Sequence, residues 1–309
     1  MGAARLSREQ VLSAISNITV WKKGGQRAVH KPLLLLLALA RIARGETNEF
    51  PFREVEPKLE QLLREFGRPR SSHHPEYPFY RLQRDGLWTL RDAEDLPHRK
   101  SNTDIPRTVL RDHNTVGQLT PAIHAALASN RSILVEAANL ILDSHWEGSY
   151  HDDILSAIGL DLTPTETVTR RPRDPAFRER VLRAYERRCA VCDFDVHLGT
   201  NAIALDAAHI MWHQAGGPDR ESNGLALCAL HHRLFDRGAF TLSLERQVVV
   251  SQDVSGSRSV EESLLRYHGR SIRAPQAEEY LADRKFIGWH DREVFRGPGR
   301  ASKAPERLV

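Results

Sequence analysis

The chain has 309 residues, of which 27% are charged and 40% hydrophobic, and its formal net charge is +4. This length allows two domains that each bury a core, and the composition is that of an ordinary soluble globular protein. The longest apolar run, residues 33–40, is far shorter than the roughly 20 residues of a membrane-spanning helix. Three cysteines in one cluster exclude a disulfide framework.

The N-terminus and the cysteines bear on the compartment in which the protein works. Residues 1–7 lack the apolar core of a secretory signal peptide. The cysteines are odd in number and close together, so thiolates held on a metal in a reducing compartment are expected. We therefore expect a cytoplasmic protein that makes no contact with a membrane.

Residues 1–162 are expected to form a mainly helical domain with a small β-hairpin. Helical periodicity predicts helices over residues 7–18, 55–66, 120–127 and 131–143, with Ser7 as the first N-cap. Residues 33–43 are apolar on all sides, which indicates the buried central helix of the domain. Two short strands, 77–82 and 87–91, are expected around the turn at Gly86, and residues 151–160 close the domain.

A linker and a second domain are expected to follow. Residues 163–173 are polar, contain two prolines and lack periodicity, which predicts a linker. The second domain should cover residues 174–296, with a helix from Pro175 to about residue 188, a strand over 205–210 and a hairpin of 240–244 with 247–251. Residues 297–309 are expected to form a disordered tail.

Two pairs of metal-binding residues share one spacing. Cys189 and Cys192 form the first pair, and Cys228 and His231 form the second. Two such pairs converge on one tetrahedral ion, and four protein ligands saturate zinc, so the predicted zinc site is structural. The alternative is two unrelated pairs, with Cys228 a small buried apolar residue.

Two segments are rich in positive charge. Residues 21–31 contain Lys22, Lys23, Arg27 and Lys31 without an acidic residue, and residues 168–188 contain eight arginines against three acidic residues. Such runs suit binding to a polyanion. The alternative for either run is an ordinary solvated face.

The second domain resembles the HNH (ββα-metal) endonucleases. The residues that carry the resemblance are Ala-His-Ile at 208–210, Asn-Gly-Leu-Ala-Leu-Cys at 223–228 and His-His-Arg-Leu-Phe-Asp at 231–236. It covers roughly residues 175–292, because Tyr-His-Gly at 267–269 and Gly-Trp-His at 288–290 are also similar to restriction-type members. The resemblance implies hydrolysis of phosphodiester bonds in DNA.

Chemistry suggests a role for each residue of this motif. His209, neutral near pH 7, would take the proton from the attacking water. His232 would bind a catalytic Mg²⁺ or Mn²⁺ ion. Asn223 would orient His209 through its backbone or hold the loop. Many family members carry an acid directly before the catalytic histidine, where this chain has Ala208; Asp206 is therefore expected either as a second metal ligand or as a core-facing or supporting residue.

The first domain resembles the sulfur-binding domain of phosphorothioate-dependent restriction endonucleases. The resemblance covers about residues 5–160 and is carried by Arg-Ala-Val-His-Lys-Pro-Leu-Leu-Leu-Leu at 27–36, Tyr-Pro-Phe-Tyr-Arg-Leu at 77–82 and Asp-Gly-Leu-Trp at 85–88. It implies binding to double-stranded DNA in which sulfur replaces a non-bridging phosphate oxygen. The alternative for the aromatic segment is a packed strand.

Sulfur is larger and softer than oxygen and accepts hydrogen bonds poorly, so a shallow apolar cup would favour it. Tyr77, Pro78 and the stem of Arg81 are expected to form this cup. His30 and Lys31 would hold the charge of the modified phosphate. Flanking phosphates would bind Arg27, Lys22 and Lys23. Neighbouring bases would be read by residues 71–74 or by Arg107 and Arg111.

The sequence thus predicts an α+β protein of two domains: a mainly helical sulfur-binding domain and a ββα-metal domain held by a structural zinc ion. The predicted function is that of a modification-dependent restriction endonuclease. One alternative gives the nuclease another DNA mark, such as a methylated base. The other is a zinc-stabilised DNA-binding protein without activity. A homodimer is compatible with the function, because two centres can cut two strands.

Overall fold

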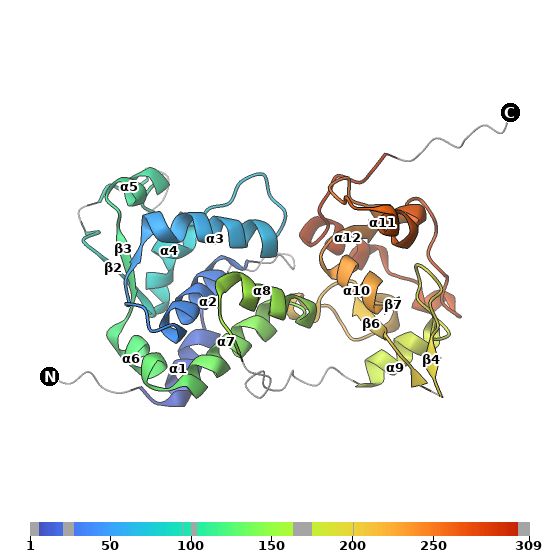
Figure 1. The fold of residues 1–309 in the computed structure, drawn as a ribbon, viewed down its shortest axis with the longest axis horizontal. Helices are drawn as coiled ribbons and strands as arrows, with labels where there is room; N and C mark the ends of the chain where they lie inside the picture. Colours follow the sequence, from blue (N-terminus) through green and yellow to red (C-terminus); the bar gives the residue numbers. More distant parts are fainter. Residues whose placement is uncertain are drawn as a thin grey trace. The chain divides into compact units, whose positions relative to one another are not determined.

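The computed structural model describes residues 6–20, 28–94, 96–99, 104–162, 175–199 and 201–301. The chain folds as two compact units, Met1–Arg170 and Arg171–Val309, and both contain helices and strands (Figure 1). The expected α+β class with two domains is confirmed. The expected linker at 163–173 lies outside the described residues, and the expected domain limits stay predictions. Among the described helices, none is long and apolar enough to cross a membrane.

One buried helix organises the first unit. This helix, α2 (His30–Ala43), buries Pro32 through Ala40 together with Ile42, which confirms the expected central helix. Helices α3 (Phe52–Phe66), α4 (Glu76–Arg81), α6 (Pro121–Ser129), α7 (Arg131–His145) and α8 (His151–Ile158) pack on it (Figure 1). Helix α1 (Arg8–Ser16) packs on α6 and α7, and α5 (Arg107–Asp112) packs on α3. Ser7 caps α1 as expected, because its hydroxyl accepts from the Gln10 amide at 3.2 Å.

A small antiparallel sheet lies beside these helices. Its strand order is β1–β3–β2, formed by Phe50–Pro51, Val116–Leu119 and Trp88–Arg91. At Gly117 an added Cβ would lie 2.1 Å from Cζ2 of Trp88, so the strand passes too close to the buried indole for any side chain.

The expected hairpin of residues 77–82 with 87–91 is wrong. The first segment is helix α4, followed by a 3-10 turn over Leu82–Asp85, and the second segment pairs with β3 instead. Pro78 is the third residue of α4, where a backbone amide has no partner within the helix, so proline is tolerated there. Phe79 is fully buried between the rings of Phe52 and Trp88, at centroid distances of 4.8 and 5.8 Å.

The second unit contains a two-stranded ribbon followed directly by a helix. Strand β6 (Leu205–His209) pairs antiparallel with β7 (Gly224–Cys228), and α10 (Ala229–Asp236) begins at the next residue. This is the expected ββα order. Helix α9 (Pro175–Ala184) packs on the ribbon. It ends earlier than expected, because Glu186 and Arg187 adopt left-handed backbone conformations, with φ of 55° and 53°.

Further elements surround the ribbon. They are the hairpin of β8 (Phe240–Leu242) and β9 (Val248–Val250), which confirms the expected pairing, the short pair β4 (His197–Leu198) and β5 (Asn201–Ala202), and helices α11 (Arg258–Ser263) and α12 (Arg284–Glu293). His290 of α12 is fully buried, and its ring stacks on Phe235 of α10 at a centroid distance of 3.7 Å. The C-terminal helix is thereby fixed against α10.

The expected tail begins later than Gly297. Gly299 pairs with Ser251, and the Arg300 amide donates to the Val250 carbonyl at 2.8 Å. These backbone bonds extend the ordered unit to at least Arg300. The rest of the expected tail, residues 302–309, lies outside the described residues.

Candidate functional site

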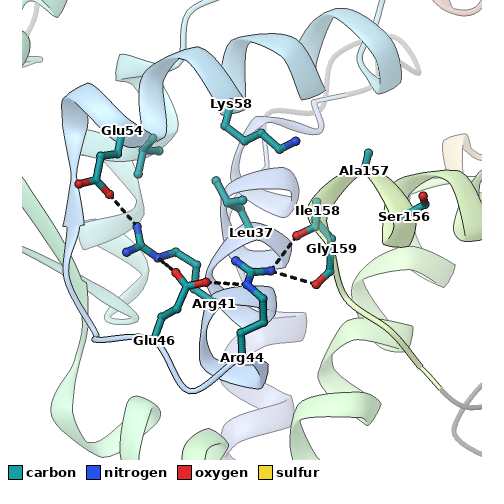
Figure 2. A pocket seen from close by; sticks show the side chains of 11 residues that line it. Leu37, Arg41, Arg44, Glu46, Glu54, Lys58, Ser156, Ala157, Ile158 and Gly159 are labelled. Carbon is teal, nitrogen blue, oxygen red and sulfur yellow. Dashed lines mark hydrogen bonds and ion pairs between the residues drawn. The ribbon is translucent and has the colours of Figure 1, made fainter.

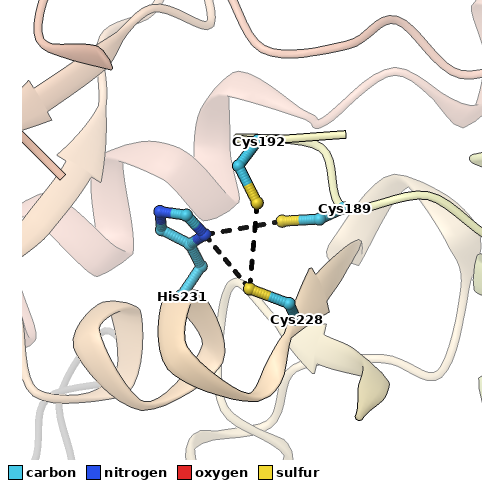
Figure 3. A group of neighbouring side chains, drawn as sticks. All are labelled: Cys189, Cys192, Cys228 and His231. Carbon is cyan, nitrogen blue, oxygen red and sulfur yellow. Dashed lines mark hydrogen bonds between the residues drawn. The ribbon is translucent and has the colours of Figure 1, made fainter. Parts of the chain in front are cut away.

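The four predicted zinc ligands lie together in the second unit (Figure 3). Their ligand atoms are all within 4.8 Å of one another. Nδ1 of His231 is 3.2 Å from Sγ of Cys228 and 3.6 Å from Sγ of Cys189, while the sulfurs of Cys192 and Cys228 are 3.9 Å apart. Sulfur ligands of a tetrahedral zinc ion are separated by roughly 3.7 Å, so the donor set fits zinc.

Local backbone structure explains why these side chains converge. The chain turns sharply between Cys189 and Cys192, because the Asp193 amide donates to the Cys189 carbonyl and Asp193 has a φ of 59°. Cys228 ends β7, and His231 lies in the first turn of α10. The Nε2 atom of His231 faces the Ser263 carbonyl at 2.9 Å, so it carries the proton and leaves Nδ1 for a metal.

The thiols of this cluster influence each other's protonation. Hydrogen bonds from Cys189 and Cys192 lower the pKa of the Cys228 thiol, whereas the hydrogen bond with Cys189 is the main cause that raises the pKa of Cys192. A bound dication would favour the thiolate at every sulfur.

His209 is buried at the end of β6. Its ring stacks on Phe177 of α9 at a centroid distance of 4.2 Å, and its Nε2 atom lies 2.7 Å from Oδ1 of Asp219. Gly224 pairs with His209 across the ribbon, and an added Cβ there would lie 2.4 Å from Cγ2 of Val181. The His209 side chain is thus on the face of the ribbon that α9 covers.

Asn223 holds the loop between the two strands. Its Nδ2 atom donates to the carbonyls of Met211 and Pro218, both at 3.0 Å, and its Oδ1 atom accepts from the Met211 amide at 2.9 Å. The Asn223 carbonyl also accepts from the Ile210 amide at 2.9 Å. Of the two roles expected for Asn223, the side-chain contacts favour holding the loop.

Asp206 and His232 are neighbours. Oδ2 of Asp206 is 3.9 Å from Nδ1 of His232, whose Nε2 atom is 3.4 Å from Oδ2 of the buried Asp236. The neighbouring His232, followed by Arg178, lowers the pKa of Asp206 to about 2, although partial burial opposes this shift. Asp206 is therefore an ionised carboxylate beside an imidazole.

The alternation of side chains along β6 determines on which face of the strand Asp206 and His209 lie. Residues 206 and 208 share one face of the strand, and residues 205, 207 and 209 share the other. Asp206 thus lies on the same face as Ala208, the position that directly precedes His209. A carboxylate is available on that face, two residues before the place where many HNH proteins carry their acid. His209 lies on the opposite face.

In the first unit, predicted residues of one segment cluster around Tyr77. The Arg81 guanidinium lies 4.3 Å from the centre of the Tyr77 ring, and the His74 ring stacks on it at 4.6 Å. Arg99, which sequence reasoning missed, lies 5.4 Å from the same ring and donates to its hydroxyl at 3.3 Å. Arg81 itself is held by the buried Asp104, with Nε 3.0 Å from Oδ1.

His30 belongs to the same cluster. Burial, and then the positive charge of Arg70, His74, His73 and Arg81, lowers the pKa of His30 to about 4. The imidazole is therefore neutral near pH 7. A role for His30 at the modified phosphate stays a prediction, and with this lowered pKa its ring would contribute a hydrogen bond and not a charge.

Other residues predicted to touch DNA have partners within the protein. Lys31 forms an ion pair with Asp85 at 2.5 Å, and Pro78 is buried in α4. Arg107 and Arg111 both bind the buried Glu56 of α3, so they tie α5 to α3 and the expectation that they read bases loses support. Arg27, Lys22 and Lys23 lie outside the described residues.

The first unit also has an open pocket of about 410 Å³ between α2, α3 and α8 (Figure 2). Arg41 and Arg44 of α2 both reach Glu46, at 2.8 and 2.5 Å, and Arg44 donates to the carbonyls of Ile158 and Gly159. The charged walls of this pocket are thus bound to one another. They join the end of α2 to the end of α8.

Two family models match the chain. The model described as the ScoMcrA-like DNA sulfur-binding domain matches residues 8–163, which is half of the chain. The chain belongs to this family. A second model, HNH endonuclease, matches residues 189–243, so both resemblances expected from the sequence are confirmed. We call Met1–Arg170 the sulfur-binding unit and Arg171–Val309 the HNH unit.

Solved structures give a consistent but distant comparison. The sulfur-binding domain of ScoMcrA complexed with phosphorothioated DNA is 19% identical and covers 51% of this chain and 98% of its own, with a TM-score of 0.44. The corresponding SprMcrA domain is 24% identical and covers 50% and 95%, with a TM-score of 0.43. The type IV phosphorothioation-dependent restriction endonuclease ScoMcrA is 20% identical, with 29% of its chain covered and a TM-score of 0.42. No curated protein matches the chain.

Metal removal should unfold the HNH unit selectively. Structural zinc contributes on the order of 10 kcal/mol to the folding of small zinc domains, and three segments of this unit meet at the cluster. We expect a chelator, or Cys228→Ser, to abolish the calorimetric unfolding transition of the HNH unit. The transition of the sulfur-binding unit should persist, and added zinc should restore the wild-type profile after chelation. An unchanged profile in protein shown by elemental analysis to be metal-free would contradict a structural metal.

His30 should remain neutral well below pH 6. Since its folded pKa is about 4 and its ordinary value is 6.5, only the unfolded chain binds the proton between these values. Through His30, the free energy of unfolding should therefore decrease as the pH falls through this window. NMR titration of the His30 ring measures the folded pKa directly, with urea-unfolded protein as the control. A folded value near 6.5 would disprove the neutral state.

Proposed function

We propose that this protein is a modification-dependent restriction endonuclease. Its sulfur-binding unit would bind double-stranded DNA that carries phosphorothioate linkages, and its HNH unit would hydrolyse phosphodiester bonds nearby. One observation carries the proposal: a sulfur-binding module and an HNH module occur in one chain. An HNH nuclease has low intrinsic selectivity for DNA sequence. A module that recognises modified DNA would direct it to a defined target.

The cluster around Tyr77 has the chemistry that a phosphorothioate requires. The aromatic face of Tyr77 and the stem of Arg81 offer apolar surface for sulfur, while the guanidinium groups of Arg81 and Arg99, which also pair with the buried Asp104 and Glu76, would donate hydrogen bonds to the phosphate. Because His30 is neutral, it would contribute a hydrogen bond. Lys31 and Pro78 would act by positioning these groups, and Arg27 would bind a flanking phosphate.

We assign a structural zinc ion to Cys189, Cys192, Cys228 and His231, since four protein ligands leave no open position on zinc. A second ion, Mg²⁺ or Mn²⁺, would be held by His232 and Asp206. Their ligand atoms are 3.9 Å apart, within the roughly 3 to 4.2 Å that separates two ligands of an octahedral Mg²⁺. When bound, that ion supplies charge stabilisation at the phosphate and at the leaving oxygen.

His209 would accept the proton of the attacking water, and Asn223 would fix the loop that follows His209. Asp206 and His209 lie on opposite faces of β6. A scissile phosphate placed against the strand edge not paired with β7 could be approached from both faces. In this placement, Asp206 and His232 would hold the metal ion on one side of the phosphate, and His209 would accept the proton on the other side.

The partner that these assignments imply is double-stranded DNA with phosphorothioate linkages. A homodimer would supply two HNH centres, one for each strand. Reduced thiolates at the zinc cluster suit the cytoplasm, where cellular DNA and a reducing environment occur together.

Cleavage of paired duplexes tests the function. We expect cleavage, with Mg²⁺ or Mn²⁺, of a duplex that carries phosphorothioate linkages, and at least tenfold slower cleavage of the same sequence without sulfur. His209→Ala should reduce the rate by about 10²–10⁴-fold and leave binding of modified DNA intact. His197→Ala, on the exposed strand β4 of the same unit, is the matched control. Equal cleavage of both duplexes, or cleavage of a methylated duplex alone, would indicate that the first unit recognises a DNA mark other than sulfur. No cleavage of any duplex would indicate a DNA-binding protein without nuclease activity.

Discrimination between sulfur and oxygen should depend on Tyr77. Tyr77→Ala removes the ring that contacts Arg81, Arg99 and His74. We expect its preference for modified over unmodified duplex, measured by competition binding, to fall by about tenfold or more, equivalent to roughly 1.4 kcal/mol. Tyr77→Phe should keep the preference, and Tyr80→Ala in the same helix is the matched control. An unchanged preference in Tyr77→Ala would exclude Tyr77 from the sulfur site.

A further inference from the structure

Asp219 lies against the proposed catalytic base. Its Oδ1 atom is 2.7 Å from Nε2 of His209, and the His209 side chain is only 4% exposed whereas that of Asp219 is 31% exposed. The Asp219 carboxylate is thus in hydrogen-bond contact with that ring nitrogen. Nothing in the HNH motif itself indicated Asp219, since it lies in the loop between the motif residues.

The backbone on both sides of Asp219 is fixed. The Pro218 carbonyl accepts from Nδ2 of Asn223 at 3.0 Å, and the Asp219 carbonyl accepts from Nη2 of Arg180 at 2.8 Å. The Arg220 carbonyl accepts from the Asn223 amide at 2.9 Å. These bonds hold the Asp219 carboxylate toward His209 in the free protein.

This contact determines which ring nitrogen of His209 can accept a proton. A carboxylate only accepts hydrogen bonds, so Nε2 of the neutral imidazole carries the hydrogen and Nδ1 keeps the lone pair. Stacking on Phe177, at an interplanar angle of 19°, fixes the plane of the ring. Together, Phe177 and Asp219 set the direction in which the Nδ1 lone pair points.

We infer that Asp219 is the positioning residue of the nuclease centre, an inference that rests on the proposed function. When water attacks phosphorus, a new P–O bond forms while the bond between phosphorus and the leaving 3′-oxygen breaks. One O–H bond of the water breaks and its proton bonds to Nδ1 of His209, and the departing 3′-oxygen takes a proton from solvent. The hydrogen on Nε2 stays on the ring, and the negative charge of Asp219 stabilises the imidazolium that forms. Asp219 itself neither takes the proton nor touches the DNA.

Glu221 provides a matched control. It lies in the same loop, is also acidic, and forms an ion pair with Nε of Arg180 at 3.0 Å rather than contacting His209. Glu221→Gln therefore removes a nearby negative charge without removing the partner of the imidazole. Any general effect of loop charge on cleavage should appear in both variants.

The experiment compares full-length wild type with Asp219→Ala, Asp219→Asn and Glu221→Gln, all loaded with zinc. Nitrogen-15 NMR of labelled histidine should show the Nε2–H tautomer of His209 in wild type and in Glu221→Gln, and loss of this preference in Asp219→Ala. We expect kcat for modified DNA to fall by about 10²–10⁴-fold in Asp219→Ala with little change in KM. Asp219→Asn, which keeps the shape, should lose at least tenfold in kcat, and this variant decides the case if Asp219→Ala is poorly folded.

Retention of both the Nε2–H tautomer and full kcat in Asp219→Ala and Asp219→Asn would overturn the inference while the proposed function stood. A tautomer that changes in Glu221→Gln to the same extent would also overturn it. Because the tautomer is measured in the DNA-free protein, it tests the role of Asp219 even if wild type cleaves no DNA. That last result would count against the proposed function instead.

Discussion

The HNH unit depends on the point at which Cys189, Cys192, Cys228 and His231 meet. This cluster joins the turn after α9, the last residue of β7 and the first turn of α10. His231 and His232 are consecutive on a helix, so their side chains point about 100° apart. Fixing His231 on the thiols therefore aims His232 toward Asp206. A structural ion would thus determine the position of a residue proposed to hold a different ion.

In the proposed site, the two faces of the ribbon would have different tasks. Its α9 face carries His209 with Phe177 and Asp219, and its other face carries Asp206, beside His232. Absence of an acid at position 208 need not remove the metal ligand, because position 206 belongs to the same face of the strand. A comparison of position 208 alone would miss that Asp206 can take the place of the acid. The two-residue period of a strand reveals it, because it puts positions 206 and 208 on the same face.

How much the sequence could predict differs between parts of the molecule. Ser7 as a helix cap, the buried leucines of α2 and the convergence of the two Cys/His pairs were predicted correctly, because each depends on local spacing or on an apolar run. Residues 77–82 were predicted as a strand because aromatic residues favour strands, but burial of Phe79 between two other rings selects a helix there. Arg99 and Asp219 carry no local signal: Arg99 lies 22 positions from Tyr77, and Asp219 is 10 positions from His209. Such contacts depend on how the loops close.

The loop that Asn223 closes is tightly packed in the free protein. At Gly217 an added Cβ would lie only 1.8 Å from the Met211 carbonyl oxygen, so the middle of this loop is in direct backbone contact with its first turn. A segment this confined has little conformational entropy left to lose when a substrate arrives. Selectivity for the scissile bond would then come from how well a DNA strand conforms to a rigid template. Stiff and easily bent DNA sequences should consequently be cut at different rates, even when they carry the same mark.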